Sequence, residues 1–217
     1  MTSDCVGERT RCLSPSPSNR YGIILFLFPF LVSCAALNNK NAVINTSLIE
    51  SSVIKDGARP ANFGLIGRVS VRDEKQGFSG GIHWQHTDTG DEILLLSPLG
   101  QVVAQIQSSA EDVSLTTSEK KVYHAASMEH LTEQVLGWYL PLEGLRYWIQ
   151  SMNSPTTTAS LDRDSDGRVV TIRQDGWEIA YASYFPSGQF QIERPKVLML
   201  NRGDLRIKLV IDQWKTD

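Results

Sequence analysis

The sequence contains very few cysteines, and their positions exclude a disulfide-stabilised fold. Of the three cysteines in 217 residues, Cys5 and Cys12 lie close to the N-terminus and Cys34 is the last. If the residues before Cys34 are removed as a leader, the mature chain keeps a single thiol, and a disulfide framework needs at least two. The apolar content of 41% is enough for one core, so we expect a single domain stabilised by apolar packing.

Patterns that indicate nucleic-acid or nucleotide binding are also missing. The formal net charge is −3 and no run of Lys and Arg occurs, so nothing indicates a surface for a phosphate backbone. Neither the phosphate-loop pattern G-x-x-x-x-G-K-[ST] nor the dinucleotide pattern G-x-G-x-x-G is found. We therefore expect no nucleic-acid partner and no cofactor.

Metal-binding and catalytic patterns are weak. His83 and His86 lie three residues apart, a spacing that places them on opposite faces of a strand, so no zinc site is indicated. The segment 162–167 begins like a calcium loop, but its twelfth position is Arg173 instead of a bidentate glutamate, which favours a polar turn. Ser97 lacks the G-x-S-x-G context of a hydrolase. We expect no metal site, no catalytic residues and no enzymatic activity.

The first feature that is present is a leader. Arg20 precedes an apolar run from Tyr21 to Val32, which is shorter than the roughly 20 residues that span a bilayer but fits a secretory signal peptide. The run ends in Leu-Val-Ser-Cys at Cys34, which resembles the bacterial lipobox, whose cysteine becomes the lipid-modified first residue. A cleavage site that includes a cysteine by chance is the alternative. We predict a lipoprotein signal peptide over residues 1–33 and lipidation of Cys34.

Lipidation predicts a membrane-anchored protein. Each buried methylene of an acyl chain contributes about 0.8 kcal/mol, so the two or three chains of a bacterial lipoprotein hold it firmly. Ala35 follows the cysteine, where enteric-type sorting uses aspartate for retention in the inner membrane. By resemblance to that rule, we expect a lipid anchor in the outer membrane, with the protein facing the periplasm.

Residues 34–57 are predicted to form the lipidated N-terminus, a polar tether and one amphipathic helix. Its apolar residues recur at roughly helical spacing, and Gly57 is a plausible end of the helix. The polar face carries only one lysine, so packing on the domain is favoured over lying on a membrane. The apolar positions are Val43, Ile44, Leu48, Ile49, Val53 and Ile54.

Residues 58–217 are predicted to form the main domain, in which the pattern changes to period two. Short β-rich runs are separated by polar or glycine-containing breaks, which indicates an antiparallel meander. Two helices are expected at 127–136, between a Ser127 cap and Gly137, and at 142–150. The fold class is therefore α+β with about eleven antiparallel strands. The predicted strands are 63–72, 78–86, 92–96, 101–107, 112–116, 121–123, 157–161, 168–173, 177–184, 197–200 and 205–214.

The turn Ser97-Pro98-Leu99-Gly100 separates two of these strands. Pro98 fixes φ and Gly100 tolerates a left-handed conformation, so the four residues are expected to form a hairpin turn. Leu99 is unusual, because turns normally carry polar residues at this place. Two alternatives are open: Leu99 folds back over the core, or it points outward as an apolar contact for a membrane or another lipid.

The residues and their order resemble the family of the outer-membrane lipoprotein receptor LolB. The similarity runs over essentially the whole mature chain, and only the long segment before Arg20 departs from it, which leaves the true start open. The matching positions are 67–71, Gly80, 84–85, 94–100, 136–138, 140–142, Leu145, Trp148, 174–177, Tyr181, 205–209 and Trp214.

This resemblance implies an open half-barrel whose helices cover an apolar cavity. The family accepts lipoproteins from the soluble periplasmic carrier LolA through their acyl chains and inserts them in the outer membrane. Its protruding apolar loop residue falls on Leu99. The implied partners are therefore a LolA-like carrier, lipoprotein acyl chains and the outer membrane, for a protein expected to be monomeric.

Eight large apolar or aromatic residues are candidates for the cavity lining. For each of them ordinary core packing is the alternative, because sequence does not separate a lipid-facing side of the sheet from a helix-covered core. The eight are Trp84, Leu95, Ile106, Leu145, Trp148, Trp177, Tyr181 and Leu209. The favoured function is a lipoprotein acceptor; the alternatives are a passive lipid- or peptide-binding envelope lipoprotein and an enzyme acting on envelope polymers.

Overall fold

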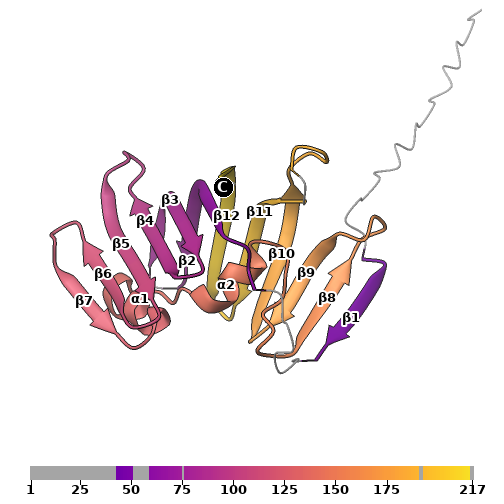
Figure 1. The fold of residues 1–217 in the computed structure, drawn as a ribbon, viewed down its shortest axis with the longest axis horizontal. Helices are drawn as coiled ribbons and strands as arrows, with labels where there is room; N and C mark the ends of the chain where they lie inside the picture. Colours follow the sequence, from indigo (N-terminus) through magenta and orange to yellow (C-terminus); the bar gives the residue numbers. More distant parts are fainter. Residues whose placement is uncertain (1–42, 51–58, 75, 191–192, 216–217) are drawn as a thin grey trace, which may run out of the picture. The chain divides into compact units, whose positions relative to one another are not determined.

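The computed structural model describes residues 43–50, 59–74, 76–190 and 193–215 (Figure 1). These residues lie in one compact unit that spans residues 39–217. The predicted signal peptide and Cys34 lie outside the described residues. Within the described part, no helix has the length and apolar character needed to cross a membrane.

The described strands form one antiparallel sheet of twelve strands, in the order β1-β8-β9-β10-β11-β12-β2-β3-β4-β5-β6-β7. The predicted α+β class is confirmed, and the eleven predicted strands correspond to β2 to β12. The bounds are β1 (Asn45–Ile49), β2 (Phe63–Arg72), β3 (Gly77–Thr87), β4 (Gly90–Leu96), β5 (Val102–Ser109), β6 (Val113–Thr117), β7 (Val122–Ala125), β8 (Ala159–Arg163), β9 (Val169–Gln174), β10 (Trp177–Tyr184), β11 (Pro195–Arg202) and β12 (Leu205–Lys215).

The strand β1 corrects the prediction of an amphipathic helix before the domain. Residues Asn45–Ile49 pair with β8 instead, while the rest of the predicted helix, residues 51–57, lies outside the described part. The error has a simple cause. Ile44 and Leu48 are four residues apart, a spacing that places two side chains on the same face of a helix and also on the same face of a strand. Thr46 favours the strand, because its hydroxyl donates to the Asp162 carboxylate over 2.7 Å.

Alternating burial gives the sheet an apolar inner face and a polar outer face. In β12, Ile207 and Leu209 are buried, whereas Arg206 and Lys208, which alternate with them, are exposed. Side chains of successive strand residues point to opposite faces, so the same alternation continues through β2 to β5. The inner face is the one that the helices cover.

Two helices, α1 (Met128–Leu136) and α2 (Leu142–Trp148), follow β7 and cover the inner face. The predicted cap at Ser127 is confirmed, because its side chain accepts from the His130 backbone amide, and α1 ends at Gly137 with φ of 82°. Figure 1 shows α1 beside β6 and α2 in front of the middle of the sheet. Both predicted helices are therefore present, and α2 ends two residues earlier than the expected segment 142–150, a difference of about half a turn.

Candidate functional site

The turn between β4 and β5 holds Leu99 outside the domain. The Gly100 amide donates to the Ser97 carbonyl over 2.8 Å, and the Ser97 amide donates to the Gln101 carbonyl over 2.8 Å. The Ser97 hydroxyl also accepts from the Gln101 amide over 3.2 Å. With its backbone closed by these bonds, the turn leaves 88% of Leu99 exposed. Of the two alternatives for this residue, the structure shows the outward one.

Gly100 makes this turn possible. Its φ is +80°, a conformation that costs L-residues roughly 1–2 kcal/mol and glycine almost nothing. A Cβ at this position would meet no other atom within 4 Å. The glycine is therefore required by the backbone conformation and not by a lack of space.

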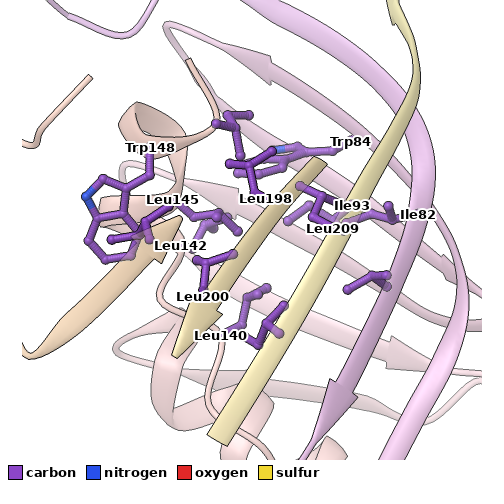
Figure 2. Close-up of a cluster of buried hydrophobic side chains, with 14 of the residues drawn as sticks. Ile82, Trp84, Ile93, Leu140, Leu142, Leu145, Trp148, Leu198, Leu200 and Leu209 are labelled. Carbon is purple, nitrogen blue, oxygen red and sulfur yellow. The ribbon is translucent and has the colours of Figure 1, made fainter. Parts of the chain in front are cut away.

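The eight residues predicted to line a cavity all lie in the apolar interior between the inner face and the helices. Each is less than 5% exposed, and all belong to one continuous core. Figure 2 shows Leu142 and Leu145 of α2 pointing toward Leu198 and Leu200 of β11, with Trp84 and Leu209 close by. The structure thus brings together residues from β3, β4, β5, β10, β12 and α2.

Aromatic rings fill the part of this interior beneath α2. The rings of Trp148 and Trp177 lie 6.2 Å apart, and those of Tyr139 and Trp177 lie 6.4 Å apart. Trp148 donates its indole N–H to the Gln174 side chain over 2.9 Å. The Tyr181 hydroxyl donates to the Trp148 carbonyl over 2.6 Å, and burial raises the pKa of Tyr181 well above its usual value of 10.0. Tyr181 is therefore neutral at ordinary pH, in keeping with an apolar site.

Sequence reasoning did not identify a buried ion pair that fastens α2 to the sheet. Asp91, the second residue of β4, has a side chain only 1% exposed, and its carboxylate lies 2.5 Å from the Arg146 guanidinium of α2. The indole N–H of Trp84 donates to the same carboxylate over 2.8 Å, and His86 Nδ1 lies 2.8 Å from it. The pair joins residues 55 positions apart in the sequence, so no local pattern could have indicated it.

The two largest surface hollows over the described residues lie apart from the eight residues. One of about 450 Å³ is lined by polar side chains, among them Gln85, Glu92 and Gln107. Another of about 640 Å³ lies on the outer face, where Met199, Arg206 and Lys208 contribute to its walls. The predicted lining residues themselves pack against one another as a core.

The segment 162–167 comprises the last two residues of β8 and most of the polar turn that leads to β9. The Asp164 carboxylate accepts from the amides of Asp166 and Arg168, each over 2.9 Å, so it caps the turn instead of facing outward. Over the described ranges, no group of three or more His, Cys, Asp and Glu side chains is arranged to hold a metal ion.

Comparisons with known proteins agree on one family. A family model described as "Outer membrane lipoprotein LolB" matches residues 61–214. The chain is 42% identical over 194 residues to the "Outer-membrane lipoprotein LolB" of Nitrosomonas europaea, covering 88% of this chain and 91% of that protein. It is 41% identical over 152 residues to the protein of that name from Thiobacillus denitrificans, covering 70% and 79%.

Among solved structures, the crystal structure of a LolA superfamily protein from Nitrosomonas europaea superposes with a TM-score of 0.45 at 7% identity. That match covers 74% of this chain and 88% of the other.

Proposed function

Because the chain belongs to the family of the outer-membrane lipoprotein LolB, we propose that it receives lipoproteins from a periplasmic carrier of the LolA type and inserts them into the outer membrane. The acyl chains of the cargo are the part it recognises. Cys34 carries its own lipid anchor, which holds the domain in the periplasm beside the membrane. The role is one of transfer and needs no catalytic residue.

The acyl chains of the cargo explain why an apolar interior is needed. A chain of about sixteen carbons loses on the order of 12 kcal/mol when it leaves a membrane for water. A lipoprotein with several such chains therefore requires a continuous apolar environment during transfer. The interior formed by the inner face, α1 and α2 is the part of this domain that offers one.

Entry of an acyl chain requires movement of the covering segment. The eight candidate residues are less than 5% exposed and pack against one another, so the interior accepts a chain only when α2 and the residues around it separate from the sheet. The contacts that resist this movement are the Asp91–Arg146 ion pair and the bonds from Trp148 and Tyr181. Cargo replaces the apolar contacts that α2 loses.

Exposed Leu99 is the single observation that carries the membrane-contact part of the proposal. A leucine moved from water into lipid gains about 1.5 to 3 kcal/mol. That amount is too small to anchor a protein, but it favours orientations in which a loaded domain touches the bilayer. The free energy of the acyl chains then falls at each step of transfer, from the carrier to this interior and from there to the membrane.

The test is a reconstituted transfer with the variant Leu99→Glu. The mature protein is incubated with a lipoprotein-loaded carrier, and cargo is measured first in the complex and then, after vesicles are added, in the membrane. We expect uptake from the carrier to be unchanged and delivery to the membrane to fall at least tenfold, because the glutamate carboxylate does not enter lipid.

Val122→Glu is the matched control, since Val122 in β7 is another apolar residue that is 55% exposed. It should deliver cargo as the unchanged protein does. Equal delivery by Leu99→Glu and the control would remove the proposed role of the turn. Binding of cargo without any delivery by the unchanged protein would show a passive lipid binder instead.

A further inference from the structure

Three basic side chains meet on the outer face of the sheet. Arg72 from β2 and Arg206 and Lys208 from β12 line the hollow of about 640 Å³, together with the exposed Met199. We call these four residues the outer-face basic patch. Ser70 and Asn201 also line the hollow and offer a hydroxyl and an amide, both of which can bind anionic oxygen atoms.

The two arginines are direct cross-strand partners. In the pairing of β12 with β2, Arg206 lies opposite Arg72, and Lys208 lies opposite Ser70 in the next position on the same face. Side chains in this relation have Cβ atoms about 4.5 to 5.5 Å apart, and like charges there destabilise a sheet. The arrangement therefore works against folding unless an anion neutralises it.

Other arginines of the same face are neutralised within the protein. Arg68 lies four residues before Arg72 in β2 and on the same face. It makes a two-point contact with Asp212 at 2.9 and 3.1 Å. Arg173 on β9 lies 2.8 Å from Asp162 and 3.2 Å from Glu178. No ion pair joins Arg72, Arg206 or Lys208 to any residue that the structure describes. Glu178 lines the hollow, but Arg173 already engages its carboxylate.

The patch lies at the end of the sheet that carries Leu99. Neighbouring strands are antiparallel throughout, so β2 and β4 run in the same direction and end at the same edge. Arg72 is the last residue of β2, Arg206 is the second residue of the adjacent β12, and the Ser97–Gly100 turn follows directly after β4. An approach of this end to a bilayer, with the outer face tilted toward it, brings Leu99 and the three bases to the same surface.

We propose that the outer-face basic patch binds the anionic phosphate headgroups of a phospholipid surface while Leu99 enters the apolar layer. The inference rests on the proposed membrane contact of Leu99 but not on cargo binding in the interior. The three cations are opposite in charge to the phosphate headgroups. The exposed apolar side chain of Met199 beside them suits the boundary between the phosphates and the acyl chains. The patch thus fixes which face of the domain meets the membrane.

Protection of Lys208 from chemical modification tests the proposal in the lipid-anchored protein. The mature protein is reconstituted in vesicles of phosphatidylcholine alone, or of equal parts phosphatidylcholine and phosphatidylglycerol, and the acetylation rate of each lysine is followed by mass spectrometry. We expect Lys208 to react at least threefold more slowly in the anionic vesicles. High salt should remove the protection, because exposed charges are then screened.

Lys215 serves as a control within the same molecule, since it ends β12 and so lies at the other end of the sheet. The acetylation rate of Lys215 should be the same in both kinds of vesicle.

The double variant Arg72→Gln/Arg206→Gln should lose the protection of Lys208. It should unfold at the same or a higher temperature than the unchanged protein, since it removes a like-charge pair. Cargo uptake from the carrier should be unaffected, which separates this site from the proposed transfer function.

Four results would overturn the proposal. They are equal Lys208 rates in both vesicles, equal slowing of Lys208 and Lys215, protection of Lys208 by inorganic phosphate without lipid, and protection by the loaded carrier in neutral vesicles. The last result would assign the patch to an acidic protein partner, and the third to a free anion.

Discussion

At the scale of single residues, two positions separate what the sequence revealed from what it could not. Leu99 stood out because a large apolar residue between Pro98 and Gly100 contradicts normal turn composition, and the structure shows it 88% exposed. Asp91 did not stand out, because an aspartate near the start of a strand after a turn is ordinary. Only the fold brings the Arg146 guanidinium to the buried Asp91 carboxylate.

The left-handed conformation of Gly100 leads to a prediction at this scale. Gly100→Ala should lower the free energy of unfolding by about 1 kcal/mol through backbone strain, and urea titration measures this loss. The change should also lower lipoprotein delivery several-fold, because the strained turn no longer presents Leu99 in one orientation. Gly167→Ala is the matched control, since Gly167 has a φ of +79° and equally open surroundings. It should cost the same stability and leave delivery unchanged; a parallel loss of delivery would mean that stability alone matters.

At the scale of elements, period-two patterning predicted β2 to β12, and capping residues predicted α1. The strand β10 has the predicted bounds, and so has β2, because in both strands large apolar side chains recur at every second position over most of the strand. The strand β1 was missed for the opposite reason: its partner β8 lies more than a hundred residues away. A pairing of this kind is decided by the free edge of the sheet and not by the local sequence.

The docking of β1 is expected to depend on pH through Asp162. Burial alone would raise the pKa of this carboxyl, but the hydrogen bonds from Thr46 and Arg173 outweigh it and lower the pKa below 3.8. A lowered carboxyl pKa contributes stability above the unfolded value, and this is lost as the pH falls through the folded value. Asp162→Asn should therefore destabilise the protein by about 1 kcal/mol at neutral pH. It should cost less at acidic pH, as the pH falls through the lowered pKa of Asp162.

Urea unfolding at the two pH values measures that difference. Asp212→Asn removes the partner of Arg68 at the exposed surface, where ion pairs contribute little to stability, and it is the control. A cost for Asp162→Asn that is the same at both pH values would show that the charge is not responsible.

The ion pair between α2 and β4 predicts how easily the interior opens. Arg146→Met keeps an apolar stem of similar length and removes the cation from Asp91. The variant should lose about 3 kcal/mol of stability, because it removes the guanidinium that compensates the buried Asp91 carboxylate, and it should take up a fluorescent fatty acid faster. Arg163→Met, at an exposed site bonded to the Gly167 carbonyl, should change neither quantity. Slower or unchanged uptake in Arg146→Met would indicate that α2 does not cover the entry route.

At the scale of the whole molecule, the sequence predicted that large apolar residues would gather, but not how tightly they would pack. The eight residues come from six separate elements, and their mutual contacts depend on side-chain shapes that no periodicity encodes. Residues that line an apolar cavity and residues that fill a core have the same composition, so the sequence could not distinguish the two. The structure shows them packed, which makes opening by α2 part of the proposed function.

Ligand binding should therefore stabilise the entire domain. A synthetic diacylated lipopeptide at about 100 times its dissociation constant should raise the free energy of unfolding by about 2.7 kcal/mol. Thermal unfolding measures the increase, and fluorescence of Trp148 and Trp177 should change in parallel because both rings face the interior. The same peptide without acyl chains is the control. An equal effect of both peptides would place binding outside the apolar interior.

The pairing of β2 with β12 decides when the sheet can be completed. Among the described strands these are the second and the last along the chain, and Leu65 lies opposite Trp214 in the finished register. During synthesis the centre of the sheet therefore stays open until β12 emerges, leaving two incomplete halves with unpaired edges. Contacts of such long range form slowly, so this protein is expected to be most vulnerable to aggregation just before its last strand arrives.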